Sequence, residues 1–164
     1  PLPEAQLDRF LMHVTIGYPD AKSKREILHL VRSEARNNTP EVPTQVAQEA
    51  LFAARQEILE MHMAPEVEEY IIQLIMATRN PEVYGEDLNS WLEYGASPRG
   101  TIALDRCARA HAWIQGRDFV SPDDVQEILF DALRHRILLS FEAEAGGVTP
   151  DQVLETIRQR VPCA

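Results

Sequence analysis

Three helix starts of similar form carry the most informative polar residues of the sequence. Each pairs a hydroxyl residue with a following proline, at Ser97-Pro98, Ser121-Pro122 and Thr149-Pro150. This is the pattern of an N-cap followed by proline at the first helical position. Two of them continue with acids or with a capping-box glutamine, which suit the positive end of the helix dipole. The first continues with Arg99 and Gly100, which do not suit the positive end of a helix dipole.

Arg99 therefore breaks a local rule. A cation in the first turn of a helix costs a few tenths to about 1 kcal/mol, and a glycine in place of alanine costs about 1 kcal/mol more. Residues that destabilise their own helix without a stabilising contact nearby tend to mark functional sites. A guanidinium beside unpaired helix N–H groups, with a glycine that admits a close approach, predicts an anion-binding site. An Arg99 that swings out to pair with the acidic segment of the chain explains the residue equally well.

Arg9 is the second cation that could do chemistry. It lies in Asp8-Arg9-Phe10, where the chain enters a mostly apolar run. An ion pair between Arg9 and Asp8 is the simpler interpretation. The functional interpretation is a guanidinium that projects past the edge of the subunit.

The sequence lacks the motifs of several common catalytic and nucleotide-binding sites. The sequence contains no GxxxxGK followed by Ser or Thr, no GxSxG and no HExxH, so it predicts no P-loop, no nucleophile elbow and no zinc protease site. The five histidines are scattered singly, and we expect them at the surface or the edge of the core. Cys107 is expected to be buried and Cys163 to lie in a frayed tail, without a zinc site. Such cysteine usage is typical of a reducing compartment, and the cytoplasm is the predicted location.

Charge narrows the class of partner. The net charge of −10 argues against a nucleic-acid-binding protein, which would show a basic face. The excess of acids lies between Glu41 and Glu93. A solvated helix face and a docking surface for a basic partner both explain it. No stretch approaches about 18 uninterrupted apolar residues, so no membrane span is predicted.

The first elements that must position these residues are a strand and a helix. Phe10–Ile16 is short, apolar and rich in β-branched residues, which predicts a buried strand. Asp20 is placed to cap a helix over 21–36. The run Asn37–Pro43 contains two prolines and two asparagines, and it predicts a boundary.

The pattern after this boundary is helical. A helix capped by Thr44 should carry one apolar stripe that ends at Met61, and a second should run from Pro65 to Arg79. Residues 80–96 read as a long connection, either functional or packed by its own aromatics. Three more helices follow the proline starts and end near Gly116, Arg136 and Val161. Met61 and Met63 are interpreted as core residues.

Two blocks of sequence then indicate a family. Residues 1–12, with Leu7-Asp8-Arg9-Phe10, and Gly95–Thr101, with Ser97-Pro98-Arg99, resemble the C-terminal part of MoxR-type AAA+ ATPases. The block His135–Glu144 is also similar to this family. The resemblance covers essentially the whole chain, which has no initiator Met, and we expect it to be a fragment of a longer protein.

The resemblance implies a mainly α fold, with a strand-helix remnant of an α/β AAA+ core followed by an all-α helical lid bundle. The core end would be residues 1–39 and the lid residues 40–164. Arg9 would be the arginine finger, acting in trans as a catalytic group, and Arg99 the sensor-2 arginine on the ATP phosphates. Walker A, Walker B and sensor 1 are absent, so the fragment alone should be inactive, whereas the full-length protein would bind ATP and Mg and hydrolyse ATP.

The resemblance also implies partners. The full-length protein would form a homo-oligomeric ring, a hexamer, that remodels or activates client proteins as a chaperone, often with von Willebrand factor A-domain partners. A related magnesium-chelatase-like ATPase subunit and a non-enzymatic acidic helical interaction module are the alternatives. Client, pathway and ring size are not given by the sequence. The sequence also does not tell whether Arg99 acts in cis or in trans, or whether the acidic segment is a docking surface.

Overall fold

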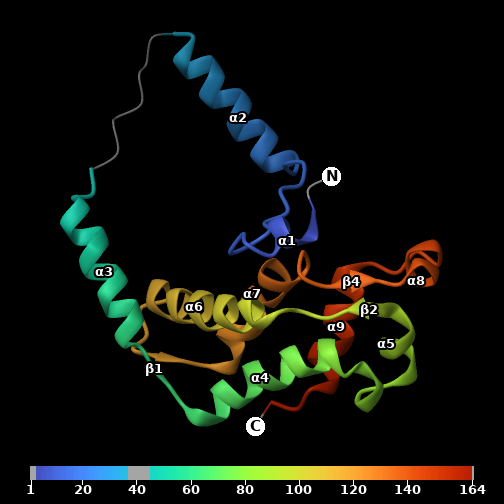
Figure 1. The fold of residues 1–164 in the computed structure, drawn as a ribbon. Helices are drawn as coiled ribbons and strands as arrows, with labels where there is room; N and C mark the ends of the chain where they lie inside the picture. The colour runs from blue at the N-terminus through green and yellow to red at the C-terminus, as the bar shows by residue number, and fades with distance from the viewer. Residues whose placement is uncertain (1–2, 37–44, 164) are drawn as a thin grey trace. The chain divides into compact units, whose positions relative to one another are not determined.

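The computed structural model describes residues 3–36 and 45–163 (Figure 1). The chain divides into two compact units, a helical unit of residues 1–14 and 54–164 and a small unit of residues 15–53. The first twelve residues, which contain Arg9, therefore belong to the helical unit. The predicted division at residues 39 and 40 stays a prediction, and the proposed boundary Asn37–Pro43 lies outside the described residues, as does the Thr44 cap.

The mainly α prediction is confirmed. The small unit contains α2 (Ala21–Glu34) and the start of α3 (Gln48–Glu60). The elements of the helical unit are α1 (Glu4–Leu7), β1 (His62–Met63), α4 (Pro65–Arg79), the 3-10 turn η1 (Pro81–Val83), α5 (Glu86–Trp91), β2 (Leu92–Tyr94), α6 (Pro98–Ile114), β3 (Phe119–Val120), α7 (Pro122–Leu133), β4 (Leu138–Leu139), α8 (Phe141–Ala145) and α9 (Pro150–Arg160). No helix within 3–36 and 45–163 is long and apolar enough to cross a membrane.

The proline helix starts are confirmed. Ser97, Ser121 and Thr149 are the N-caps of α6, α7 and α9, each with proline in the first turn. The caps of α7 and α9 are complete capping boxes, closed by Asp124 and Gln152. Each box satisfies N–H groups that the first helical turn cannot pair internally. The helix predicted over Pro65–Arg79 is also confirmed as α4, so all four of these helices begin where the sequence predicts.

The core lies between α4, α6, α7 and α9. Its fully buried side chains come from all four helices and include Leu74, Leu104, Leu129, Leu133, Leu154 and Ile157. The predicted inner face of α4 is confirmed, since Val67, Ile71, Leu74 and Thr78 are buried. Met61, Met63 and Cys107 are also buried, as predicted.

The long connection expected over 80–96 contains regular structure. The segment holds η1, α5 and β2, and β2 pairs antiparallel with β4 through Leu92 and Leu139. A second pairing joins β1 to β3 in parallel, with His62 opposite Phe119. Both pairings join residues far apart in sequence. The two- and three-residue strands involved are too short to show an alternating pattern.

The strand predicted over Phe10–Ile16 is also wrong. The segment has no regular structure, and four of its apolar side chains are at least half exposed, from Leu11 at 50% to Ile16 at 90%, while Met12 packs partly buried against the core. A strand requires a paired neighbour for its backbone groups. Here side chains take that place, because the carbonyls of residues 10, 11 and 13 accept hydrogen bonds from the arginines and the histidine of residues 134–136.

The helix predicted over 21–36 is confirmed as α2 of the small unit. The carboxylate of Asp20 accepts a hydrogen bond from the Ser23 N–H at 2.7 Å. This contact lowers the pKa of Asp20, because it favours the ionised form.

Candidate functional site

The N-terminus of α6 is fixed by the last turn of α4. The Ala96 N–H donates to Thr78 Oγ1 at 3.0 Å, and Arg79 Nη1 donates to the Ala96 carbonyl at 3.3 Å. A Cβ on Gly95 would lie 2.2 Å from the Thr78 carbonyl oxygen, so the chain reaches this position only with glycine. The main chain that leads to Ser97 and Arg99 therefore has a defined path.

The first turn of α6 is closed by its own residues. Ser97 Oγ accepts from the Arg99 N–H at 3.1 Å, and the Gly100 N–H donates to the Ser97 carbonyl at 2.8 Å. Gly100 is buried, and a Cβ there would meet Ile75 and Leu133 at 3.1 Å. The argument that Gly100 admits a ligand is therefore wrong, because the small residue is needed for helix packing. The Arg99 side chain is the part of this turn that is available to an anion, and 54% of it is exposed.

The missing acid at this helix start is supplied by Asp8. Ser97 Oγ donates to both carboxylate oxygens of Asp8, at 3.0 and 2.9 Å, across a sequence separation of 89 residues. Arg99 Nε lies 3.8 Å from Asp8 Oδ2. A carboxylate near the N-terminus of a helix is favoured by the dipole, so the rule that Arg99 breaks in the sequence is satisfied in three dimensions. Within residues 3–36 and 45–163, Arg99 pairs with Asp8 and with no acid of the segment Glu41–Glu93.

Arg136 holds Asp8 from the other side. Its side chain is 2% exposed, and its Nε lies 3.3 Å from Asp8 Oδ1. Burial lowers the pKa of the Arg136 guanidinium, and the negative charge of Asp8 opposes this shift. In the sequence, Arg136 stands only as part of a basic cluster with Arg134 and His135 directly after a helix, and its partner Asp8 could not be read there.

The same cluster binds the backbone that carries Arg9. Arg136 donates to the carbonyls of Asp8, Phe10 and Leu11 at 3.2, 2.6 and 3.2 Å. His135 Nε2 lies 3.0 Å from the Phe10 carbonyl oxygen. These contacts hold residues 8–11 against the end of α7, close to α1 in Figure 1.

Arg9 itself is exposed. The ion pair with Asp8 that its sequence suggested is wrong, because within the described residues Asp8 pairs with Arg136 and Arg99 and no ion pair includes Arg9. The structure thus places Arg99 beside Asp8, the residue that directly precedes Arg9.

Comparisons with known proteins show what the chain is similar to. A family model described as the AAA lid domain matches residues 89–157. Chaperone MoxR1 of Mycobacterium tuberculosis is 38% identical over 98% of this chain, which spans 42% of that protein. Protein MoxR of Paracoccus denitrificans is 35% identical over 91% of this chain and 47% of its own length.

The solved structures include a close match. A crystal structure of a candidate ATPase from Cytophaga hutchinsonii superposes with a TM-score of 0.94 and 41% identity, over 100% of this chain and 49% of that one. The chain belongs to the MoxR-type AAA+ family. It corresponds to the C-terminal part of the MoxR type and spans about half the length of the relatives it matches. The matched lid contains Arg99 and Arg136, whereas Asp8 and Arg9 precede it.

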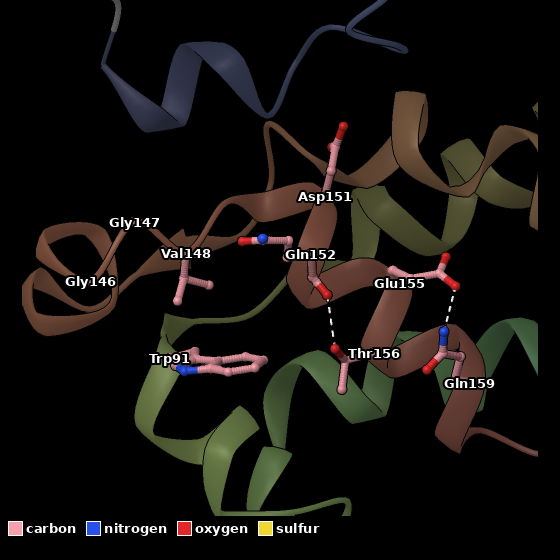
Figure 2. Close-up of a pocket in the computed structure, with 9 residues that line it drawn as sticks. All are labelled: Trp91, Gly146, Gly147, Val148, Asp151, Gln152, Glu155, Thr156 and Gln159. Atoms are coloured by element: carbon pink, nitrogen blue, oxygen red, sulfur yellow. Dashed lines mark hydrogen bonds between the residues drawn. The ribbon is translucent and has the colours of Figure 1, made fainter.

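One pocket of the described residues lies away from these arginines. It has a volume of about 620 Å³ and is lined by Trp91, residues 146–148 and α9. Figure 2 shows two hydrogen bonds along its wall: Thr156 Oγ1 donates to the main-chain carbonyl of Gln152 at 2.9 Å, and Gln159 Nε2 donates to Glu155 Oε1 at 2.7 Å. The cavity beside Asp8, Ser97 and Arg136 is smaller, about 230 Å³. The candidate site is defined by the charges and hydrogen bonds of Asp8, Ser97 and Arg136, and not by the volume of its cavity.

Three of the histidines contact another ionisable side chain. The rings of His13 and His135 meet edge to face at 5.9 Å, and His111 Nδ1 lies 2.6 Å from Asp124 Oδ1. Burial lowers the pKa of His135, which fits a structural role in holding the Phe10 carbonyl. Over 3–36 and 45–163 no group of three His, Cys, Asp or Glu residues is arranged to hold a metal ion.

Proposed function

We propose that this chain supplies two phosphate-directed arginines to the ATP site of a full-length MoxR-type ATPase. Arg9 is the arginine finger, which enters the site of a neighbouring subunit, and Arg99 is the sensor-2 arginine. The observation that carries the proposal is their shared anchorage. Both guanidinium groups are exposed, and the carboxylate of Asp8 ties together the turn that carries Arg9 and the helix that carries Arg99.

The two arginines would act by electrostatic stabilisation of negative charge. Phosphoryl transfer spreads negative charge over the γ-phosphoryl oxygens, and a well-placed arginine finger accelerates it by about 10³–10⁵-fold. A guanidinium is always protonated and matches the geometry of phosphate oxygens. With no cluster of metal ligands in the described residues, the Mg²⁺ ligands of the full-length protein would come from other residues and from ATP.

Hydrolysis is coupled in this proposal to chaperone-like work on client proteins by a homo-oligomeric ring. Support comes from the family and from the relative named Chaperone MoxR1. Two arginines that serve a site shared between subunits also require assembly, since a trans-acting finger has no function in a monomer. Von Willebrand factor A-domain proteins are proposed partners on the family resemblance alone.

Residence in the cytoplasm belongs to the same proposal. Cys107 and Cys163 are both free thiols, and unpaired cysteines are the norm in reducing compartments.

Steady-state ATP turnover of the full-length protein tests the proposal. Arg9→Ala and Arg99→Ala should each reduce turnover by at least about 100-fold, with unchanged thermal unfolding. Arg106→Ala is the matched control, because Arg106 is an exposed arginine farther along α6 and should leave turnover unchanged. Arg9→Ala and Arg99→Ala proteins that turn over ATP at the wild-type rate would overturn the proposal.

A further inference from the structure

Asp8 faces three groups that come from two separate parts of the helical unit. Ser97 Oγ donates to both of its oxygens at 3.0 and 2.9 Å, and Arg136 Nε lies 3.3 Å away. Arg99 Nε is more distant, at 3.8 Å. The Asp8 side chain is 24% exposed, so a large part of its solvation is replaced by these contacts. The two bonds from the Ser97 hydroxyl are the closest of them.

Among the described residues, the side-chain hydrogen bonds and ion pairs between the turn that carries Arg9 and the start of α6 are those of Asp8 with Ser97 and Arg99. Arg136 and His135 hold its carbonyl groups at Phe10 and Leu11. These contacts fix the backbone against the end of α7. The contact from this turn to the start of α6 is made by the side chain of Asp8, the residue directly before Arg9.

The charge of Asp8 also separates two cations. Arg99 and Arg136 both approach its carboxylate, and the positive charge of Arg99 lowers the pKa of Arg136. Loss of the carboxylate would leave the buried Arg136 facing Arg99 with no counter-ion between them, which a group with 2% exposure cannot relieve by hydration. The turn that holds Asp8 and Arg9 would then move away from α6.

We propose that Asp8 is a positioning residue for Arg9, which ties the turn that carries Arg9 to the N-terminus of α6 so that Arg9 and Arg99 are presented together. This inference rests on the proposed function, because it assigns Asp8 a role in placing the arginine finger. Displacement of a catalytic group by about 1 Å costs on the order of 100-fold in rate, so a modest movement of the turn has a measurable effect.

The test is ATP turnover of the full-length protein carrying Asp8→Asn, in the wild-type background and in the Arg9→Ala background. Asn is nearly the same size as Asp but carries no charge. In the wild-type background we expect kcat to fall on the order of tenfold or more. In the Arg9→Ala background we expect a further change of less than about twofold, because the guanidinium that Asp8 positions is already gone. A merely structural role would produce the same loss in both backgrounds and would overturn the inference.

Two further variants keep the result interpretable. Ser97→Gly removes the hydroxyl that donates to Asp8 but keeps a residue that is tolerated at an N-cap, and it should lower kcat in the same direction even if Asp8→Asn fails to fold. Asp105→Asn is the matched control, since it removes an ion pair with Arg109 in the middle of α6, and it should leave kcat unchanged.

The finger role of Arg9 and the positioning role of Asp8 can be disproved separately. Wild-type turnover of Arg9→Ala would contradict the finger assignment and with it the role of Asp8. A slow Arg9→Ala protein combined with wild-type turnover of Asp8→Asn and Ser97→Gly would leave the finger in place and contradict the positioning role alone.

Discussion

Asp124 is a fully buried charge at the start of α7. Its side chain has no exposed surface, and it accepts hydrogen bonds from Arg117 Nη1 at 2.7 Å and from the Ser121 N–H and hydroxyl at 2.8 Å. His111 Nδ1 lies 2.6 Å away. Burial alone would raise the pKa of Asp124, but these bonds outweigh it and hold the pKa well below the usual range.

The cost of Asp124→Ala follows from these contacts. Removal of one member of a buried ion pair costs about 3–5 kcal/mol, and loss of an N-cap interaction costs about 1 kcal/mol. Arg117 and His111 are 31% and 28% exposed, so both regain some hydration and the total should lie near the lower end. We expect a loss of about 3–4 kcal/mol in the free energy of unfolding, or roughly 10 °C in Tm for a unit of this size.

Thermal and urea unfolding followed by circular dichroism measure this loss. Asp123→Ala is the matched control, because Asp123 is the neighbouring acid in the same helical turn but is exposed, and it should change stability by less than about 0.5 kcal/mol. Equal effects of the two variants, or a loss below about 1 kcal/mol for Asp124→Ala, would refute the reasoning that the buried network stabilises the start of α7.

Two further predictions concern backbone packing and acid stability. Gly95→Ala should lower the free energy of unfolding by about 2 kcal/mol or more, since its Cβ would lie 2.2 Å from the Thr78 carbonyl oxygen, whereas Gly17→Ala, with no atom within 4 Å, should be nearly neutral in the same urea titration. The hydrogen bond from Arg160 lowers the pKa of Asp87 to about 2, so its contribution is present above the unfolded value of about 3.9 and is lost as the pH falls toward 2. Tm should therefore fall between about pH 4 and 2, and less steeply in Asp87→Asn; an unchanged slope in that variant would contradict the assignment.

Local signals in the sequence predicted the parts of the fold that depend on local chemistry. The caps at Ser97, Ser121 and Thr149 and the inner face of α4 are set by residues within one or two turns, and all were confirmed. The pairing of β2 with β4 was missed because the partner lies far along the chain, and no pattern of alternation appears in strands of two or three residues. The false strand at Phe10–Ile16 failed for a related reason, since side chains from residues 134–136 satisfy its carbonyl groups.

The candidate site was predicted in part. Arg99 stood out because it broke the charge rule at a helix start. Its compensation by Asp8 could not be read from the sequence, because the two residues meet only in three dimensions. Gly100 was misread for a similar reason, since the close packing of Ile75 and Leu133 accounts for it. Arg136 carried no separate signal beyond its basic neighbours.

The central claim is that Arg9 acts on the nucleotide of a neighbouring subunit, and subunit mixing tests it most directly. Full-length Arg9→Ala protein, which lacks the finger, is mixed with a full-length variant whose own nucleotide site is disabled at the P-loop but whose Arg9 is intact. If Arg9 acts in trans, ATP turnover should reappear in the mixture, at about a quarter of the sites in random one-to-one rings. Mixed rings that stay as inactive as the two separate variants would contradict the account.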